Sequence, residues 1–291
     1  MGLRDWVGVP DDAAMVEVLG VRLAVAREGE GPAVVCLHAI GHGGGDFAAL
    51  SALLRDRFEV IRVDWPGQGR SGAEAQPASA ARYAELLEAL LDRLGIAAPI
   101  LLGCSIGGAA ALHYAARQPV RALVLCDPGG LIEVTPAVQR FCRLFAHFFA
   151  AGERGAWWFP LAFRAYYRLV LPAPAAREQR RRIAAAAFES APVLRQAWAG
   201  FAAPAADLRA LAAGLDVPVW FAWARRDRIV RFALAKPAID RMRRASVTLF
   251  DAGHAAFLEQ PEAFARAFAD FAATLPLPAT ASIVPLPARR A

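Results

Sequence analysis

The sequence has no run of about eighteen consecutive apolar residues, the length that a membrane-spanning helix requires. Its opening stretch, MGLRDWVGVPDD, also lacks the apolar segment of a secretory signal, so we expect a soluble, cytoplasmic protein without a membrane span. Cysteine is scarce, and the spacing of the few present does not match metal-ligand motifs. Buried free thiols are therefore expected rather than disulfides or a metal site. The cysteines are Cys36, Cys104, Cys126 and Cys142.

Lysine is nearly absent, with Lys236 as the single example, so the formal net charge of +6 comes from arginine. A positive charge raises nucleic acid as a partner. The excess, however, lies within residues 131–214, and the run Arg180-Arg181-Arg182 has no accompanying pattern of aromatic residues for base stacking. A solvated helix face is the simpler interpretation, and we expect no nucleic-acid partner.

Glycine patterns that bind nucleotide cofactors are absent from the predicted strand-to-helix turns. No G-x-x-x-x-G-K-[ST] motif occurs, and no G-x-G-x-x-G motif joins a strand to a helix. The consecutive glycines Gly43 to Gly45 are not followed by lysine, so they do not match a phosphate loop of this kind. We expect no cofactor.

Short, almost wholly apolar segments alternate with helical patterns along most of the chain. Such runs are typical of parallel strands buried beneath helices on both faces of a sheet. An antiparallel hairpin around Gly20 precedes them. The fold class is therefore α/β, with a mostly parallel sheet flanked by helices. The apolar runs span residues 33–38, 58–65, 99–104, 121–127, 217–224 and 246–252.

This alternation stops between residues 131 and 214, where the pattern is helical and rich in aromatic residues. We interpret the segment as a helical cap inserted between two strands. The α/β core would then comprise residues 1–130 and 215–275. Residues 276–291 are rich in proline and show no periodicity, so a disordered or loosely docked tail is expected.

The segment Gly103-Cys104-Ser105-Ile106-Gly107 lies between an apolar strand and a helical run. In that context G-x-S-x-G predicts a very sharp turn, with the serine at strained backbone angles and glycines where side chains have no room. The Ser105 hydroxyl would lie at the N-terminus of the following helix, where the helix dipole favours developing negative charge. We predict that Ser105 is the nucleophile and that Cys104 points into the core.

A serine nucleophile needs a base, usually a histidine oriented by a carboxylate. His254 directly follows the last strand in a glycine-containing loop and is the predicted base. Asp227, after the penultimate strand, is the first choice for the carboxylate. Asp127 ends the strand that follows the nucleophile helix and competes for the same role, so both remain candidates.

Acyl transfer also needs hydrogen-bond donors at the place where the oxyanion forms. The backbone N–H of Ile106, directly after the nucleophile, is one candidate. The loop after the first central strand, LHAIGHGGGDF, supplies the other, and we choose Ile40.

Five segments in order resemble the α/β-hydrolase fold family, in its capped branch with a serine nucleophile: LHAIGHGGG, DWPGQGRSG, GCSIGG, WARRDRIV and DAGHAAFLEQPEAF. The resemblance extends from about residue 15 to 275. It implies that Asp64, Pro66 and Ser71 form a structural turn beside the site. Many relatives have His-Gly where this chain has His38-Ala39, and alanine adopts left-handed backbone angles less readily than glycine.

The resemblance implies chemistry by serine, because the haloalkane dehalogenases and epoxide hydrolases of this fold use an aspartate at the position of Ser105. We predict hydrolysis of a small hydrophobic carboxylic ester, or a related carbonyl compound, through an acyl-enzyme. Hydrolytic carbon–carbon cleavage of a dienoate-type substrate, acyl transfer and cofactor-free peroxidase chemistry remain alternatives. A ligand-binding protein with an idle triad is the alternative outside catalysis.

Overall fold

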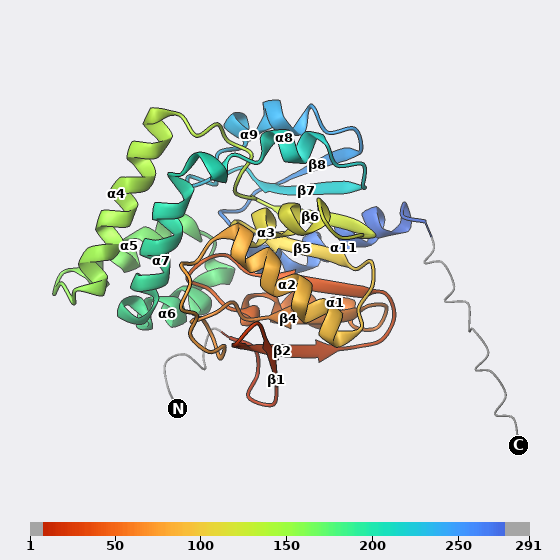
Figure 1. Cartoon of the computed structure of the whole chain (residues 1–291), viewed down its shortest axis with the longest axis horizontal. Helices are drawn as coiled ribbons and strands as arrows, with labels where there is room; N and C mark the ends of the chain where they lie inside the picture. Colours follow the sequence, from red (N-terminus) through yellow and green to blue (C-terminus); the bar gives the residue numbers. More distant parts are fainter. Residues whose placement is uncertain (1–7, 277–291) are drawn as a thin grey trace, which may run out of the picture.

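The computed structural model describes residues 8–276 and contains an eight-stranded sheet (Figure 1). The order across the sheet is β1-β2-β4-β3-β5-β6-β7-β8. Only the pairs β1·β2 and β2·β4 are antiparallel, so the mostly parallel sheet predicted from the sequence is confirmed. The strands are β1 (Ala14–Val18), β2 (Val21–Glu28), β3 (Ala33–Leu37), β4 (Glu59–Val63), β5 (Ile100–Cys104), β6 (Ala122–Cys126), β7 (Val219–Ala224) and β8 (Ala245–Phe250).

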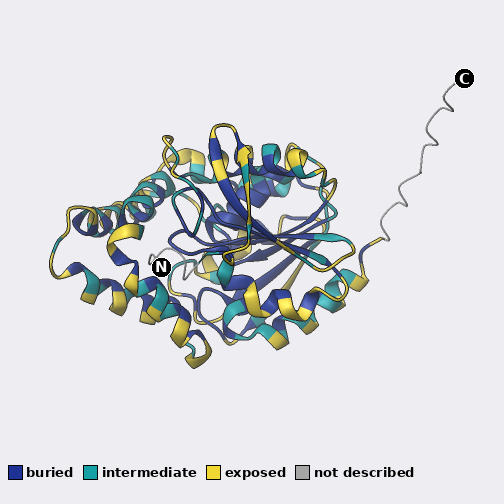
Figure 2. Ribbon diagram, turned by 90° about the horizontal axis from the view of Figure 1, so that it is seen from below, coloured by how far each residue is buried: buried dark blue, intermediate teal, exposed yellow. Residues whose placement is uncertain are grey.

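Helices cover both faces of the sheet (Figure 2). α2 (Ala80–Leu94) packs against α3 (Ile106–Ala115), and α1 (Ala48–Leu54) packs against α11 (Pro261–Ala273). Strands β5, β6 and β7 are buried along their whole length, as central strands beneath two helical layers must be. Within residues 8–276, no helix combines the length and the apolarity needed to cross a membrane. Shorter helices are α8 (Arg209–Ala213), α9 (Phe232–Ile239) and α10 (Ala256–Glu259).

The cap helices, as we call α4 to α7, lie between β6 and β7 in the chain and stand beyond one end of the sheet, at the left of Figure 1. Their bounds are Pro136–Glu153, Phe159–Val170, Arg177–Ala185 and Ala187–Phe201. α4 packs against α7, and the ring of Phe145 stacks on that of Trp198 with centroids 4.5 Å apart. All four helices fall inside the range 131–214. The division into core and cap domains stays a prediction, and the predicted tail lies, except for Pro276, outside the described residues.

Asp64 ties the glycine-rich loop after β3 to the rest of the core. Its buried carboxylate accepts backbone hydrogen bonds from Gly44 at 2.6 Å, from Arg70 at 2.9 Å and from Val9 at 3.1 Å. Ser71 donates to the Asp64 carbonyl oxygen at 2.6 Å. Because three N–H groups from separate segments bind one carboxylate, Asp64 fixes the course of all three segments. This agrees with a structural role for the turn.

His38 joins the ends of β3 and β4. Its Nε2 accepts a hydrogen bond from the backbone N–H of Trp65 at 2.9 Å, and its Nδ1 lies 2.7 Å from the carbonyl oxygen of Ala39. This pattern requires a neutral ring with the proton on Nδ1. Complete burial lowers the pKa of His38 to about 4, so the ring stays neutral in the folded protein.

The contribution of His38 to stability is expected to fall as the pH drops from 7 to 5, because the unfolded chain takes up a proton at His38 while the folded chain does not. The pKa of His38 is 6.5 in the unfolded chain and about 4 in the folded protein. Its contribution to the free energy of unfolding is therefore complete above pH 6.5 and is lost as the pH falls toward 4. Proton linkage gives a loss of about 2 kcal/mol between pH 7 and pH 5.

Urea unfolding across this pH range measures the loss. The variant His38→Gln should be less stable than the parent at pH 7, and this difference in unfolding free energy should shrink by about 2 kcal/mol as the pH falls to 5. Parallel pH curves for the two proteins would contradict this role of His38.

Candidate active site

Ser105 sits at the sharp bend between β5 and α3. Its backbone angles, φ 53° and ψ −116°, are strained for a residue with a side chain. A Cβ atom on Gly103 would lie 2.5 Å from the carbonyl oxygen of Gly107, and one on Gly107 would overlap the carbonyl oxygen of Leu37. Only glycine fits at these two positions, and this is the sharp turn that the G-x-S-x-G pattern predicts.

Cys104, beside the serine, is buried in the core. Burial raises the pKa of its thiol well above the ordinary value, so the reactive thiolate is disfavoured. The Ser105 side chain, by contrast, makes no hydrogen bond to any residue from 8 to 276 and lines a cavity. Of these two adjacent residues, Ser105 is the one that lines the cavity.

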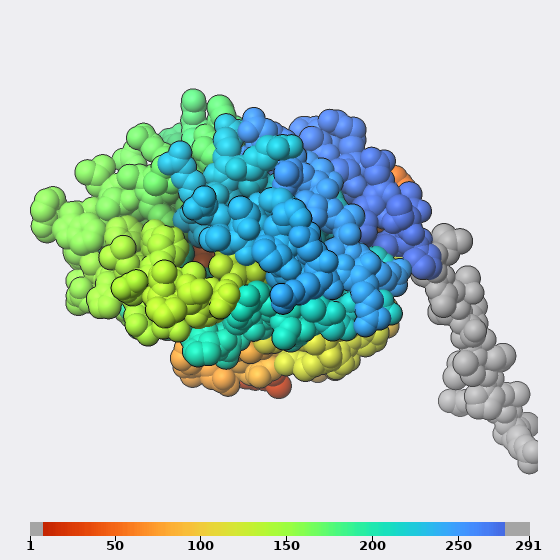
Figure 3. Space-filling view, turned by 90° about the horizontal axis from the view of Figure 1, so that it is seen from above, coloured from red at the N-terminus to blue at the C-terminus, as the bar shows by residue number. Residues whose placement is uncertain are grey.

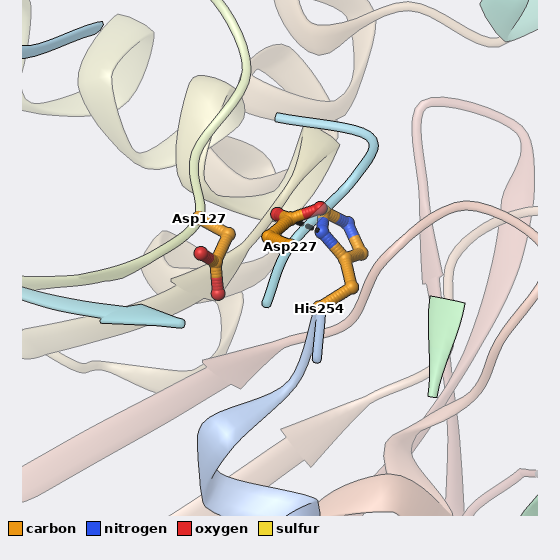
Figure 4. Close-up of side chains that lie close together, drawn as sticks. All are labelled: Asp127, Asp227 and His254. Atoms are coloured by element: carbon orange, nitrogen blue, oxygen red, sulfur yellow. Dashed lines mark hydrogen bonds and ion pairs between the residues drawn. The ribbon is translucent and has the colours of Figure 1, made fainter. Parts of the chain in front are cut away.

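His254 and Asp227 form a hydrogen-bonded pair in loops that follow β8 and β7 (Figure 4). Nδ1 of His254 lies 2.7 Å from Oδ2 of Asp227, and both side chains are buried. The other carboxylate oxygen accepts backbone N–H groups from Ile229 at 2.7 Å and Val230 at 3.1 Å, which fixes its orientation. With the Nδ1 proton donated to Asp227, Nε2 of His254 is left as the proton acceptor.

Asp127 lies beside this pair without bonding to the imidazole. Its Oδ1 accepts the backbone N–H of Ala224 at 2.9 Å, whereas its Oδ2 is buried without a hydrogen-bond partner in the described part of the chain. Burial, and then the neighbouring Asp227 carboxylate, raise the pKa of Asp127 well above its ordinary value. Burial thus favours the neutral form of Asp127, and Asp227 is the carboxylate that is hydrogen-bonded to His254.

The same three side chains are the one group of potential metal ligands in residues 8–276, with ligand atoms within 4.8 Å of one another. The donor set suits a cation poorly. Nδ1 of His254 is engaged with Asp227, and burial favours the protonated form of Asp127, whereas metal ligation needs a free imidazole lone pair and an ionised carboxylate. The arrangement fits an orienting hydrogen bond better than a metal centre.

The two predicted oxyanion donors belong to the residue after Ser105 and to a loop that lines the cavity. Ile106 is the first residue of α3, and Ile40 follows β3 in the loop that lines the same cavity. Neither backbone N–H has an acceptor among the described residues. The left-handed angle in this loop falls at Gly41, with φ 75°, and not at Ala39, so the departure from His-Gly does not strain the backbone. The N–H of Gly41 donates to Gln68 Oε1 at 2.6 Å, which fixes the loop.

A cavity of about 470 Å³ lies over Ser105 and His254, between the sheet and the cap helices. Its mouth is visible in Figure 3 as a hollow between the lime segment of α4 and the blue segment after β7. Most of its lining is apolar or aromatic, as ligand sites generally are. The cap contributes Val138, Phe141, Tyr166, Tyr167, Val170 and Trp198 to this lining.

One histidine in this cavity has no role in the sequence prediction. His42 is 3% exposed and lines the cavity, and its Nδ1 lies 2.5 Å from Oδ2 of Asp46. The only sequence signal for this pair is the four-residue spacing within the glycine-rich loop. A loop of that composition does not reveal which way a side chain points, so the pair emerges from the structure alone.

Comparison with known proteins gives consistent matches. The model of the alpha/beta hydrolase family matches residues 34–267 of this chain. A pimeloyl-[acyl-carrier protein] methyl ester esterase of Chromobacterium violaceum is 31% identical over 260 residues, which cover 86% of this chain and 98% of that protein. The crystal structure of an enol-lactonase from Burkholderia xenovorans has a TM-score of 0.76 at 24% identity and covers 89% of this chain and 100% of that one.

Other similarities are shorter. An uncharacterized protein of Mycobacterium tuberculosis is 34% identical over 129 residues, which is 44% of this chain but 38% of the length of that protein. This chain therefore spans well under half of that relative.

Replacing the two acids separately should distinguish their roles. We expect Asp227→Asn to lower kcat on a p-nitrophenyl ester by about 10⁴-fold, because the imidazole loses the acceptor that selects its tautomer. Asp127→Asn should keep kcat within about tenfold of the parent, since an amide resembles the neutral acid and still accepts the Ala224 N–H. A larger loss from Asp127→Asn than from Asp227→Asn would reverse the assignment.

The bend itself should tolerate no added methyl group. Gly107→Ala is expected to destabilise the protein by about 3 kcal/mol, because the new methyl group would overlap the backbone carbonyl groups of Leu37 and His38, which cannot move away cheaply. Gly200→Ala, in α7, is the matched control: its new Cβ would meet only the Ala78 carbonyl oxygen at 3.8 Å. Urea unfolding compares the two variants, and equal stabilities would show that the contact at Gly107 does not constrain the bend.

Proposed function

This chain belongs to the alpha/beta hydrolase family, and we propose that it is a serine hydrolase that cleaves apolar carboxylic esters through an acyl-enzyme. The observation that carries the proposal is the 2.7 Å hydrogen bond between His254 and Asp227 beside the cavity that the strained Ser105 also lines. A buried imidazole oriented by a carboxylate is the partner that a serine nucleophile needs.

In the first half of the reaction, the Ser105 hydroxyl attacks the ester carbonyl carbon and its proton passes to Nε2 of His254. The negative charge that develops on the carbonyl oxygen is stabilised by the N–H groups of Ile40 and Ile106, aided by the N-terminus of α3. The tetrahedral intermediate then collapses, the imidazolium gives its proton to the departing alkoxide, and the acyl group remains on Ser105.

In the second half, a water molecule takes the place of the alcohol and attacks the acyl carbon while His254 accepts its proton. Collapse of the second intermediate returns the proton to Ser105 and releases the carboxylic acid. Asp227 keeps its charge throughout and stabilises the imidazolium that forms twice in the cycle.

The apolar cavity supports a small hydrophobic substrate. The names of two relatives agree in reaction type, since one is a methyl ester esterase and the other an enol-lactonase. Carbon–carbon cleavage, acyl transfer and peroxidase chemistry would use the same serine, so the substrate test below must separate them from ester hydrolysis. A cytoplasmic location and the absence of a nucleic-acid partner stay predictions.

A fluorophosphonate probe tests the nucleophile. We expect stoichiometric labelling of Ser105 in the parent and none in Ser105→Ala, which should also lose at least about 10³-fold in kcat on a p-nitrophenyl ester. The control is Ser246→Ala, an exposed serine on β8, which should label and turn over as the parent does.

The outcomes separate the alternatives. Labelling that persists in Ser105→Ala would overturn the serine assignment, and a parent that does not label would be a binding protein. If Ser105 labels but p-nitrophenyl esters from acetate to decanoate are not hydrolysed, ester hydrolysis is wrong. A dienoate and an acceptor alcohol then test carbon–carbon cleavage and acyl transfer.

A further inference from the structure

A second histidine–carboxylate pair borders the cavity that holds Ser105. Nδ1 of His42 lies 2.5 Å from Oδ2 of Asp46, and both side chains are at most 3% exposed. The remaining oxygen of Asp46 accepts a hydrogen bond from Nε2 of Gln179, a buried side chain on α6. The core loop and a cap helix together hold the imidazole of His42 in place.

Tyrosines of the cap complete this corner of the cavity. The ring of Tyr167, on α5, lies 5.5 Å from the ring of His42, and the ring of Tyr166 lies 5.2 Å from that of Tyr167. Both tyrosines line the cavity. Burial, and then Tyr166 and Asp46, raise the pKa of Tyr167 well above its ordinary value, so its hydroxyl keeps a proton to donate.

Three polar atoms in this corner lack a protein partner. Nε2 of His42 and the hydroxyl groups of Tyr166 and Tyr167 form no hydrogen bond with any residue between 8 and 276. None of them is among the buried unpaired atoms of those residues, and all three side chains belong to residues that line the cavity. Because a polar group removed from water costs free energy unless it is paired, a ligand that excludes water here must offer hydrogen-bonding atoms of its own.

The tautomer of His42 defines what the ligand should offer. In the neutral ring that donates its Nδ1 proton to Asp46, Nε2 is free to accept a hydrogen bond, while the tyrosine hydroxyls can donate one. An alcohol group meets both needs, since it can donate a hydrogen bond to Nε2 and can accept one from a tyrosine hydroxyl. A carboxylate has no proton to donate, and an alkyl chain would leave all three atoms unpaired.

We propose that His42, Tyr166 and Tyr167 form a subsite that binds a hydroxyl group of the substrate, so that the preferred ester has an apolar chain bearing an alcohol. The inference rests on the proposed function for its reaction, but the contacts that define the subsite are independent of Ser105. His42 is a specificity residue here, and Asp46 and Gln179 position it.

The test compares esters of one chain length: methyl hexanoate, methyl 3-hydroxyhexanoate, methyl 6-hydroxyhexanoate and monomethyl adipate. We expect kcat/KM for at least one hydroxy ester to exceed that for methyl hexanoate by at least about tenfold in the parent, because a site built around hydrogen bonds rejects an analogue that lacks them. In His42→Phe this ratio should fall toward one, and in Tyr167→Phe it should fall severalfold. His42→Gln, which keeps a polar atom near Nε2, should retain part of the ratio.

The exposed His147 on α4 provides the control, since His147→Phe should leave the ratio unchanged. Calorimetric binding of the same esters to Ser105→Ala, with and without His42→Phe, gives the same comparison without turnover. If the proposed hydrolase function is wrong, none of the esters is hydrolysed, but the preference for binding a hydroxy ester remains.

The proposal is wrong if no hydroxy ester is preferred, or if His42→Phe lowers kcat/KM equally for all four esters. A preference for monomethyl adipate that depends on His42 would likewise overturn the assignment, because it would show that the subsite takes an anion. If His42→Phe does not fold, His42→Gln and Tyr167→Phe decide the question.

Discussion

The close approach of three backbone segments at the end of β5 is the constraint on which the site depends. Gly107, in the first turn of α3, lies against the carbonyl groups of Leu37 and His38, and Gly103 lies against Gly107. Ser105 is held between them at φ 53°, a strain on the order of 1–3 kcal/mol. Buried strands and a helix supply the rigidity that keeps this strain in place, so the direction of the serine hydroxyl is set by packing rather than by local preference.

Buried acidic side chains place the loops around this bend. Asp64 holds the loop that carries Ile40 and His42, and Glu259 holds the loop that carries His254. Glu259 accepts the backbone N–H of Gly253 at 2.8 Å and that of Ala173, beyond α5, at 2.9 Å. The backbone N–H of His254 itself donates to Val170 of α5 at 2.7 Å. The position of the base therefore depends on the cap as well as on the sheet.

The features that the sequence predicts correctly are those with a short-range cause. Apolar runs identify the central strands. Two glycines at a fixed spacing around Ser105 indicate the bend, because a Cβ atom at either position would collide with nearby backbone. The choice between Asp227 and Asp127 is different, because both follow adjacent strands. It depends on which carboxylate reaches the imidazole in the folded chain: Oδ2 of Asp227 lies 2.7 Å from Nδ1 of His254, whereas Asp127 accepts the N–H of Ala224. The contact of Asp46 with Gln179 joins residues 133 positions apart, and no local pattern encodes it.

The second acid, Asp127, also bears on how His254 can stay neutral and so act as the proposed base. Carboxylate oxygens of Asp127 and Asp227 and a ring nitrogen of His254 lie within 4.8 Å of one another, and all three side chains are buried. If both carboxylates were charged, their combined field would favour the imidazolium before any substrate arrived, and no proton acceptor would remain. Burial opposes this by raising the pKa of Asp127, which favours its neutral form and so lessens the negative charge beside the imidazole. A single charge orients the neutral ring and stabilises it once it has taken the proton, so the burial of Asp127 favours the role proposed for Asp227.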